Sequence, residues 1–305
     1  MPVGRIMRII GGFYYLSTED GAMITAAPRG KLRQTDGIVV GDWVDYELIP
    51  PDQAVIEGVI PRTNLLKRPF VANVTQVALV FAHKNPDYNY LLMDRFLVML
   101  EAYQLPTVII LNKSDLVDAK TAEENAEPYR RIGYTTLCTS TKNGQGKADL
   151  LSALHGETTT LAGPSGVGKS ALLNMAIPGL NQQTGAVSAK IGRGRHTTRE
   201  VRLIPLPEGD GYIFDTPGFT RLDLDFISRS DLAGCFPEFT SPAENCRFQG
   251  CRHEQEPDCG VKAAVQAGAI YPWRYEHYLI FLAELKKWEE QKYQRTGHNR
   301  KQQRS

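Results

Sequence analysis

The 305-residue chain is long enough for two or three domains, and its 42% hydrophobic and 23% charged residues are typical of a globular protein. The formal net charge is only +1, so the overall charge does not by itself indicate nucleic-acid binding. No apolar run approaches the ~18 residues of a membrane span, and the first ten residues lack a signal-peptide pattern. We therefore expect a cytoplasmic protein without a membrane partner. We also expect a monomer. Its five cysteines should be thiols or metal ligands rather than disulfides.

Residues 1–68 are predicted to form a small β-barrel. Gly-, Asp- and Pro-containing turns separate five short segments rich in β-branched and aromatic residues. The segments are Ile6–Ile10, Phe13–Leu16, Ala22–Ala26, Trp43–Leu48 and Ala54–Ile60. Five strands in this length fit an oligonucleotide-binding (OB) fold, although the pattern alone does not separate it from another small barrel. Arg29, Lys31 and Arg33 form either an RNA-contacting loop or a solvated basic loop.

Residues 69–222 change to an α/β pattern. Val74–Ala82 is a nearly continuous apolar run, as in a strand buried on both faces. Asn89–Tyr103 carries apolar residues at helical spacing, and Thr107–Leu111 is a second buried-strand candidate. Strand, helix and strand within about 40 residues make a βαβ unit. The pattern recurs to about Arg221, so a mostly parallel sheet is predicted.

A phosphate-binding loop is predicted at residues 163–170. The letters GPSGVGKS match G-x-x-x-x-G-K-[ST], with a possible strand at Thr158–Ala162 before them and a possible helix after them. Lys169 should reach the β- and γ-phosphates, and the Ser170 hydroxyl should bind Mg²⁺. The predicted nucleotide-binding residues are Gly163, Pro164, Ser165, Gly166, Val167, Gly168, Lys169 and Ser170.

A guanine-reading motif precedes this loop in the chain. Asn112, Lys113, Ser114 and Asp115 form N-K-x-D directly after a predicted strand, where ligands bind in open α/β sheets. The Asp115 carboxylate can accept two hydrogen bonds from guanine, a donor pair that adenine lacks. Ser140 and Thr141 follow another possible strand, Thr136–Cys138, and resemble the short loop that completes guanine recognition.

Two segments resemble nucleotide-sensing switches. Asp215 and Gly218 belong to a D-x-x-G motif, in which Asp215 would hold a water on Mg²⁺ and the Gly218 N–H would sense the γ-phosphate. Either Thr197 or Thr198 could complete the Mg²⁺ shell. Phe219 occupies the position where many GTPases have a water-orienting glutamine, so slow intrinsic hydrolysis is predicted. The attacking water would be positioned by a partner or by His196. The alternative for His196 is a role in facing RNA or a partner.

The order of these motifs is circularly permuted. In Ras-like proteins the phosphate loop comes first, whereas here the guanine-reading motif precedes it and the cyclic order is kept. Relinking is tolerated because domain termini are commonly close together. The chain therefore runs from the D-x-x-G motif into residues 223–305, and we predict that γ-phosphate sensing is transmitted there.

Residues 223–305 are predicted to form a helical domain with a structural zinc site. Three thiols and one imidazole lie within 14 residues, namely Cys246, Cys251, His253 and Cys259. Cys138 and Cys235 fall outside this spacing and are expected to be ordinary buried cysteines. A helix should begin at Pro272, with an apolar face made by Tyr275, Tyr278, Leu282 and Leu285. From Lys286 onward, seven Lys or Arg and two Glu give a local net charge of +5, which fits either phosphate contact or a solvated terminus.

The chain resembles the bacterial ribosome small-subunit-dependent GTPase A family along nearly its whole length. The resemblance rests on GRIMRIIGGFYYL, NKSD, GPSGVGKS, GRGRHTTR, DTPGF and the C-x4-C-x-H-x5-C spacing, in that order. It implies an N-terminal OB-fold barrel, a central permuted GTPase and a C-terminal zinc domain. It further implies late maturation of the small ribosomal subunit as the role, rRNA of that subunit as a partner, and GTP hydrolysis to GDP stimulated by the subunit.

Two other functions are compatible with parts of the sequence. One is a P-loop kinase or ATPase, against which Asp115 argues. The other is a non-catalytic RNA-binding scaffold with a structural nucleotide.

Overall fold

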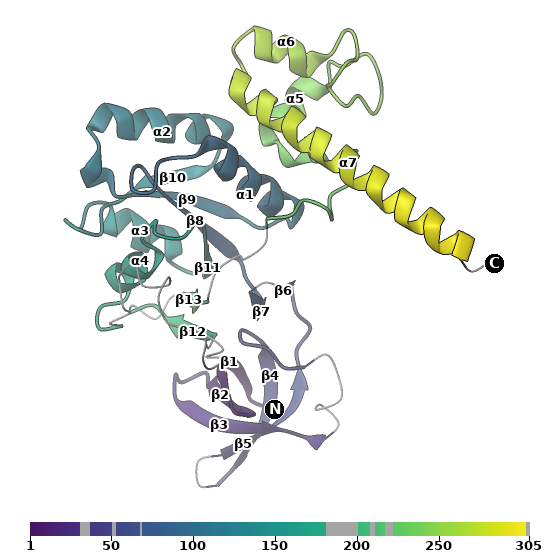
Figure 1. The fold of residues 1–305 in the computed structure, drawn as a ribbon. Coiled ribbons are helices and arrows are strands. Elements are labelled where there is room, and N and C mark those ends of the chain that lie inside the picture. The colour runs from purple at the N-terminus through teal and green to yellow at the C-terminus, as the bar shows by residue number, and fades with distance from the viewer. Residues whose placement is uncertain are drawn as a thin grey trace. The chain divides into compact units, whose positions relative to one another are not determined.

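The computed structural model describes residues 1–30, 37–50, 53–67, 69–180, 201–207, 211–216 and 222–302, with side chains up to residue 292 (Figure 1). The chain divides into two compact units, which are described separately. Unit 1 comprises Met1–Tyr88, Pro106–Ala126 and Thr135–Arg221, and unit 2 comprises Asn89–Leu105, Glu127–Tyr134 and Leu222–Ser305. Among the helices described, none is both long and apolar enough to cross a membrane.

The N-terminal part of unit 1 is a closed five-stranded barrel. Its order is β1-β2-β3-β5-β4, and pairing of β4 with β1 completes the circle. Among the described barrel strands, only β3 and β5 pair in parallel. The strand bounds are β1 Val3–Ile10, β2 Phe13–Ser17, β3 Met23–Pro28, β4 Trp43–Ile49 and β5 Gln53–Val59. Alternate residues such as Ile6, Leu16 and Ile56 are fully buried inside, which confirms the predicted barrel.

Six further strands of unit 1 form the α/β sheet in the order β10-β9-β8-β11-β13-β12. All neighbours are parallel except β12 and β13. The bounds are β8 Gln76–Ala82, β9 Thr107–Asn112, β10 Thr135–Cys138, β11 Thr158–Ala162, β12 Arg202–Pro205 and β13 Tyr212–Asp215. A short hairpin of β6 Leu65–Lys67 and β7 Phe70–Ala72 precedes β8 and was not predicted.

Helices α3 (Lys147–Leu154) and α4 (Lys169–Ala176) cover one face of this sheet (Figure 1). Leu150, Leu154, Leu172 and Leu173 of these helices pack on Val80 and Ile110 from β8 and β9. The residues that alternate with these, among them Leu79 and Ile109, are also fully buried. Burial on both faces explains the continuous apolar runs of the sequence. Two other helical elements, η2 (Ser114–Leu116) and α2 (Ala119–Ile132), follow β9.

Arg5 of the barrel contacts the α/β sheet within unit 1. Its guanidinium donates to Thr158 Oγ1 at 2.9 Å and lies 4.9 Å and 4.5 Å from the ring centroids of Trp43 and Tyr212. The pKa of Arg5 falls to about 10 because burial disfavours its charge, an effect that contact with Tyr212 partly offsets. Arg8 on the same strand pairs with Arg202 of β12, so the barrel continues directly into the sheet.

Unit 2 brings helix α1 (Tyr90–Ala102) together with the C-terminal region. Asn89 caps α1, because its side chain accepts from the Leu92 N–H. The C-terminal elements are η3 Leu232–Cys235, η4 Pro237–Phe239, α5 Thr240–Ala243, α6 Gly260–Gln266 and α7 Pro272–Gln302. Helix α7 begins at Pro272 as predicted.

Buried charges join α1 to α7. Arg274 and Asp94 are both fully buried and lie 2.7 Å apart. Arg274 also donates two hydrogen bonds, of 2.6 and 2.9 Å, to Glu238. His277 Nδ1 lies 2.6 Å from the second carboxylate oxygen of Asp94. Because each buried charge has an opposite partner, the network fixes the register of α1 on α7.

Candidate functional site

Three loops at the carboxyl ends of parallel strands form the candidate nucleotide site of unit 1. They follow β9, β10 and β11, and each contains one of the motifs singled out in the sequence. Since parallel strands end at a common edge of the sheet, segments distant in the chain come together here.

Glycines allow the phosphate loop to pack closely against the neighbouring strands. Gly163 has φ +126°, and a Cβ there would lie 2.0 Å from the Val80 carbonyl oxygen. Gly168 has φ +102° and is the N-cap of α4, which places the α4 N-terminus at the end of the loop. Backbone N–H groups at such a terminus bind anions well.

Lys169 lies at the start of α4 with its ammonium group folded back over the loop. Nζ donates to the carbonyls of Gly163 at 2.8 Å and Pro164 at 2.6 Å. Burial lowers the pKa of Lys169, since the charged form loses hydration. Ser170, next in the helix, is half-buried.

A buried amide joins the guanine-reading motif to the phosphate loop. Asn112 is fully buried, and its Nδ2 donates to the Val167 carbonyl at 2.9 Å. Its Oδ1 accepts from Thr139 Oγ1 at 3.2 Å. A Cβ on Gly168 would lie 2.3 Å from Asn112 Nδ2, so only glycine allows this approach. One side chain thus connects all three loops.

Lys113 makes a second connection between the same loops. It adopts the left-handed conformation at φ +61°, which is unusual for a residue with a side chain. Its ammonium group donates to the Gly166 carbonyl at 2.7 Å and to the carbonyl of Asn85, which follows β8. The aliphatic stem of Lys113 therefore runs between the two motifs.

The Asp115 carboxylate is oriented by the loop after β10. Ser140 Oγ donates to Asp115 Oδ1 at 2.6 Å, and Lys142 Nζ lies 4.0 Å from Oδ2. The Asp115 side chain is 16% exposed. Ser114 donates through its hydroxyl to Gln145 Oε1 at 3.1 Å, which further joins the two loops. Thr141, between Ser140 and Lys142, is half-buried.

His83, at the end of β8, is a buried group that sequence reasoning missed. Its Nδ1 lies 3.1 Å from Asn125 Nδ2, and because an amide N–H only donates, the His83 proton is placed on Nε2. Burial lowers the pKa of His83, so it is neutral at pH 7. The backbone N–H of His83 donates to the Asn112 carbonyl at 3.0 Å, so His83 lies next to the first residue of the predicted guanine-reading motif.

The switch motifs are described only in part. Asp215 is the last residue of β13 and is half-buried. The other predicted switch residues lie outside the described residues: His196, Thr197, Thr198, Gly218 and Phe219. Lys31 and Arg33 of the predicted basic loop lie outside them as well.

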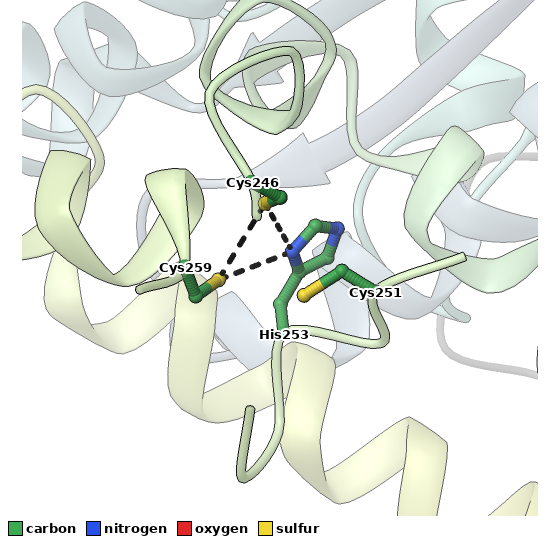
Figure 2. Close-up of side chains that lie close together, drawn as sticks. All are labelled: Cys246, Cys251, His253 and Cys259. Atoms are coloured by element: carbon green, nitrogen blue, oxygen red, sulfur yellow. Dashed lines mark hydrogen bonds between the residues drawn. The ribbon is translucent and has the colours of Figure 1, made fainter. Parts of the chain in front are cut away.

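In unit 2 the four predicted zinc ligands point toward one another (Figure 2). The Cys246 and Cys259 sulfurs are 3.8 Å apart, and His253 Nδ1 lies 3.5 and 3.3 Å from them. A tetrahedral zinc with bonds of about 2.3 Å to sulfur and about 2.0 Å to nitrogen requires a distance of about 3.8 Å between two sulfurs and of about 3.5 Å between sulfur and nitrogen. With Cys251, all four ligand atoms fall within 4.8 Å, so the cluster fits one tetrahedral metal ion.

Two tyrosines of α7 hold the loop that carries these ligands. Tyr275 Oη donates to the His253 carbonyl and Tyr278 Oη to the Arg252 carbonyl, both at 2.5 Å. His253 has φ +56°, a conformation that this support stabilises. The face predicted as apolar packing therefore also has a polar role. Of the remaining cysteines, Cys235 is buried as expected and Cys138 is half-buried.

Comparison with known proteins identifies the family. The sequence model of the RsgA GTPase family matches residues 59–225, and that of the RsgA N-terminal domain matches residues 3–56. The chain belongs to the RsgA GTPase family. It is 48% identical over 283 residues to the small ribosomal subunit biogenesis GTPase RsgA of Moorella thermoacetica, covering 92% of this chain and 97% of that protein. The Shouchella clausii protein of the same name is 42% identical over 291 residues, covering 93% and 98%.

Solved structures agree with this RsgA assignment. YjeQ from Thermotoga maritima has a TM-score of 0.82 and 38% identity, covering 93% of this chain and 98% of its own. YloQ, described as a circularly permuted GTPase, has a TM-score of 0.80 and 36% identity, covering 94% and 96%. The predicted barrel and permuted GTPase fold are therefore confirmed, and the chain is a GTP hydrolase of the RsgA family, which implies Mg²⁺ with the nucleotide.

Proposed function

We propose that this RsgA-family GTPase binds the small ribosomal subunit and assists its late maturation, hydrolysing GTP to GDP and phosphate with stimulation by the subunit. The names of its relatives in Moorella thermoacetica and Shouchella clausii support the ribosomal role. The observation that carries the enzymatic part is the pair of contacts from Asn112 to Val167 and from Lys113 to Gly166. These contacts join a guanine-reading loop to a phosphate loop. This role corresponds to a cytoplasmic protein.

In this proposal the loops after β9 and β10 select the base. Asp115, oriented by the Ser140 hydroxyl, accepts from the ring N–H and the exocyclic amine of guanine. The Lys113 stem covers one face of the purine. The nucleotide-binding set is the predicted one: Asn112, Lys113, Ser114, Asp115, Ser140 and Thr141, with Gly163, Pro164, Ser165, Gly166, Val167, Gly168, Lys169 and Ser170.

Phosphate binding would move the Lys169 ammonium group from the loop carbonyls to the β- and γ-phosphates. Two of its three protons now bond the Gly163 and Pro164 carbonyls, so the ammonium group already lies at the phosphate loop. Ser170, Asp215 and either Thr197 or Thr198 would hold Mg²⁺, which neutralises charge that develops on the phosphates. Gly218 would sense the γ-phosphate.

Water activation is the part of the mechanism that depends most on the partner. With Phe219 in the position of a water-orienting glutamine, intrinsic hydrolysis should be slow. We propose His196 as the residue that positions the water. His196→Ala should therefore reduce subunit-stimulated turnover, and an unchanged stimulated rate would exclude that role.

We further propose that the Cys246, Cys251, His253 and Cys259 cluster binds one structural zinc ion. Four protein ligands close the tetrahedron and leave no position for a substrate. Three domains would then cooperate: residues 1–68 and the basic end of α7 contacting rRNA, residues 69–222 hydrolysing GTP, and residues 223–305 holding zinc. Phe13 at the first barrel turn is 58% exposed, and Arg8 lies over Tyr15 at 5.2 Å, which suits a surface that stacks on bases.

The deciding experiment is GTP hydrolysis titrated with purified small ribosomal subunits, with wild type and Lys169→Ala in parallel. We expect slow turnover alone, a rate that rises and saturates with subunits, and no stimulated turnover in Lys169→Ala. A wild-type rate that does not change with subunits would refute the proposed stimulation. Equal affinity for GTP and ATP would refute the assigned base selection.

A further inference from the structure

The segment Leu222–Asp231, here called the strap, connects the end of the GTPase sheet with the C-terminal helices. It begins seven residues after Asp215, the last residue of β13. Leu224 and Ile227 are buried, and the Ile227 N–H donates to the Leu224 carbonyl at 2.9 Å, which closes a turn. The strap is therefore a fixed part of unit 2.

Two contacts hold the strap on helix α1. The Phe226 ring stacks on Tyr103 with centroids 4.7 Å apart and planes 15° apart, although both residues are exposed. The Leu222 carbonyl accepts a long hydrogen bond of 3.5 Å from Arg95 Nη1. Burial raises the pKa of Tyr103, and nearby Asp225 raises it further, so its ring stays neutral in the stack.

Two arginine–glutamate pairs hold the same region on α7. Arg95 forms a fork with Glu284 through hydrogen bonds of 2.9 and 2.5 Å. Arg229 of the strap donates to Glu289 at 2.6 Å. The four side chains are 20 to 43% exposed, so these pairs are less screened than those of a fully solvated surface. Arg229 thus connects the strap directly to α7, whereas Leu222 at the other end is connected to α7 only through Arg95 of α1.

We propose that Arg95 and Arg229 are positioning residues that couple the placement of α7 to the rate of GTP hydrolysis through the strap. This inference rests on the proposed stimulation by the small subunit. Helix α7 carries the basic end that would meet rRNA, whereas the strap follows Asp215 and the D-x-x-G motif in the chain. A subunit that holds α7 would therefore hold the strap, directly through Arg229 and Glu289 and indirectly through Arg95, which bonds both Glu284 and the Leu222 carbonyl.

Helix α1 provides a second route in the same direction. Tyr90, its first residue, follows Asn85 by five positions, and the Asn85 carbonyl accepts from Lys113 of the guanine-reading motif. Arg95 on α1 therefore connects α7 both to the strap and, along the chain, to the base-reading loop. Allosteric coupling between two binding sites is typically worth about 5- to 150-fold in affinity, which sets the scale of the expected effect.

The test reverses and then exchanges the charges of one pair. Arg229→Glu and Glu289→Arg are each compared with the double exchange, and GTP turnover is measured alone and at saturating small subunits. We expect each single reversal to leave basal turnover within about twofold but to lower stimulated kcat about fivefold, the lower end of typical coupling. The double exchange should restore stimulated kcat, which a merely destabilising change would not do.

Lys120→Glu is the control. It reverses one charge of the 3.7 Å ion pair with Glu124 on α2, a pair that involves neither the strap nor α7, and should not alter stimulated kcat. If wild type is stimulated and the single reversals match it, or if the exchange fails to restore the rate, the inference is wrong. If wild type is not stimulated, the proposed function itself fails. Should a reversal variant not fold, Glu284→Gln tests the other pair by removing charge at nearly constant shape, with the same loss expected.

Discussion

The contact between Gly168 and Asn112 gives the sharpest prediction for the nucleotide site. In Gly168→Ala the new methyl carbon would lie 2.3 Å from Asn112 Nδ2, at a backbone φ of +102°. Asn112 is fully buried and bonded on both sides, so it cannot move away cheaply. The strained φ costs roughly 1–2 kcal/mol, and an unpaired Val167 carbonyl costs roughly 1–3 kcal/mol. We expect a total loss of about 2–4 kcal/mol in unfolding free energy, given partial relaxation.

Gly166→Ala is the matched control for Gly168→Ala. Gly166 also has positive φ, +80°, but its new methyl would find only Pro86 Cδ at 3.9 Å. It should therefore show only the backbone term, roughly 1–2 kcal/mol. Urea unfolding of the nucleotide-free protein measures both variants under identical conditions. GTP binding should weaken more in Gly168→Ala, because Asn112 would no longer hold the phosphate loop.

A double-mutant cycle tests the cause of that loss. In an Asn112→Ala background the clash is gone, so Gly168→Ala should cost no more than Gly166→Ala does in wild type. Additive effects of Asn112→Ala and Gly168→Ala would show that the two residues do not meet. Equal destabilisation by the two glycine substitutions in wild type would refute the steric argument as well.

Three other outcomes are expected. Asp115→Asn replaces an acceptor oxygen by a donor, so GTP affinity should fall at least about tenfold while xanthosine triphosphate gains, as measured by competition with a fluorescent nucleotide. Burial lowers the pKa of His83 beneath its unfolded value near 6.5, so below that pH the unfolded state binds more protons than the folded state. The free energy of unfolding should therefore drop between pH 7.5 and 5.5. The drop should be smaller in His83→Gln, which keeps an acceptor for Asn125. Tyr275→Phe removes the hydrogen bond to the His253 carbonyl. If that hydrogen bond stabilises the ligand loop by about 1.4 kcal/mol, transfer of zinc to a chromogenic chelator should become about tenfold faster. An unchanged rate would show that Tyr275 does not support the loop.

Local sequence patterns predicted much of the fold because their physical causes are local. The apolar run Val74–Ala82 is continuous since β8 is buried on both faces, and Asn89–Tyr103 coincides with the capped ends of α1. Glycines at 163 and 168 stand where a side chain would collide with a neighbouring strand or loop. The unpredicted hairpin of β6 and β7 consists of two three-residue strands, too short to show a period.

The connections within the site could not be predicted from spacing. Asn112 and Val167 are 55 positions apart, and their contact depends on the strand order. Thr139 precedes the predicted Ser140 loop by one residue, yet nothing local marks its hydroxyl as the partner of Asn112. The helical period of α7 indicated which tyrosines share a face. It did not indicate that their hydroxyls reach the metal loop, because that depends on the packing of another segment.

Buried charges are the other class that sequence reasoning missed, and one of them lies beside Arg95 of the coupling argument. Asp94 and Arg274 stand at positions that composition would assign to solvent, because charged residues are rarely buried unless paired. The pairing partner of each is 180 residues away, so only the folded chain reveals it. Asp94 lies next to Arg95 on α1, and the two residues contact α7 at Arg274 and Glu284. Helix α1 is therefore fixed on α7 at two separated points.

The circular permutation determines the point at which the chain leaves the sheet toward the C-terminal region. In this chain order β13 is the last strand of the sheet, and it runs parallel to β11, which leads into the phosphate loop. The chain must therefore leave the sheet at the edge where Asp215 lies, the same edge as the guanine-reading and phosphate loops. Any module attached beyond β13 is connected at the nucleotide edge of the sheet. Here α3 follows the serine loop and leads back to the start of β11, so in the unpermuted order the chain would end after the helix equivalent to α3, at the amino ends of the strands. Relinking thus replaces a C-terminal attachment on the side away from the candidate nucleotide loops with one that follows Asp215 and the proposed γ-phosphate sensor Gly218. For this reason the strap, more than the overall charge of α7, should determine how strongly a bound subunit changes the rate of hydrolysis.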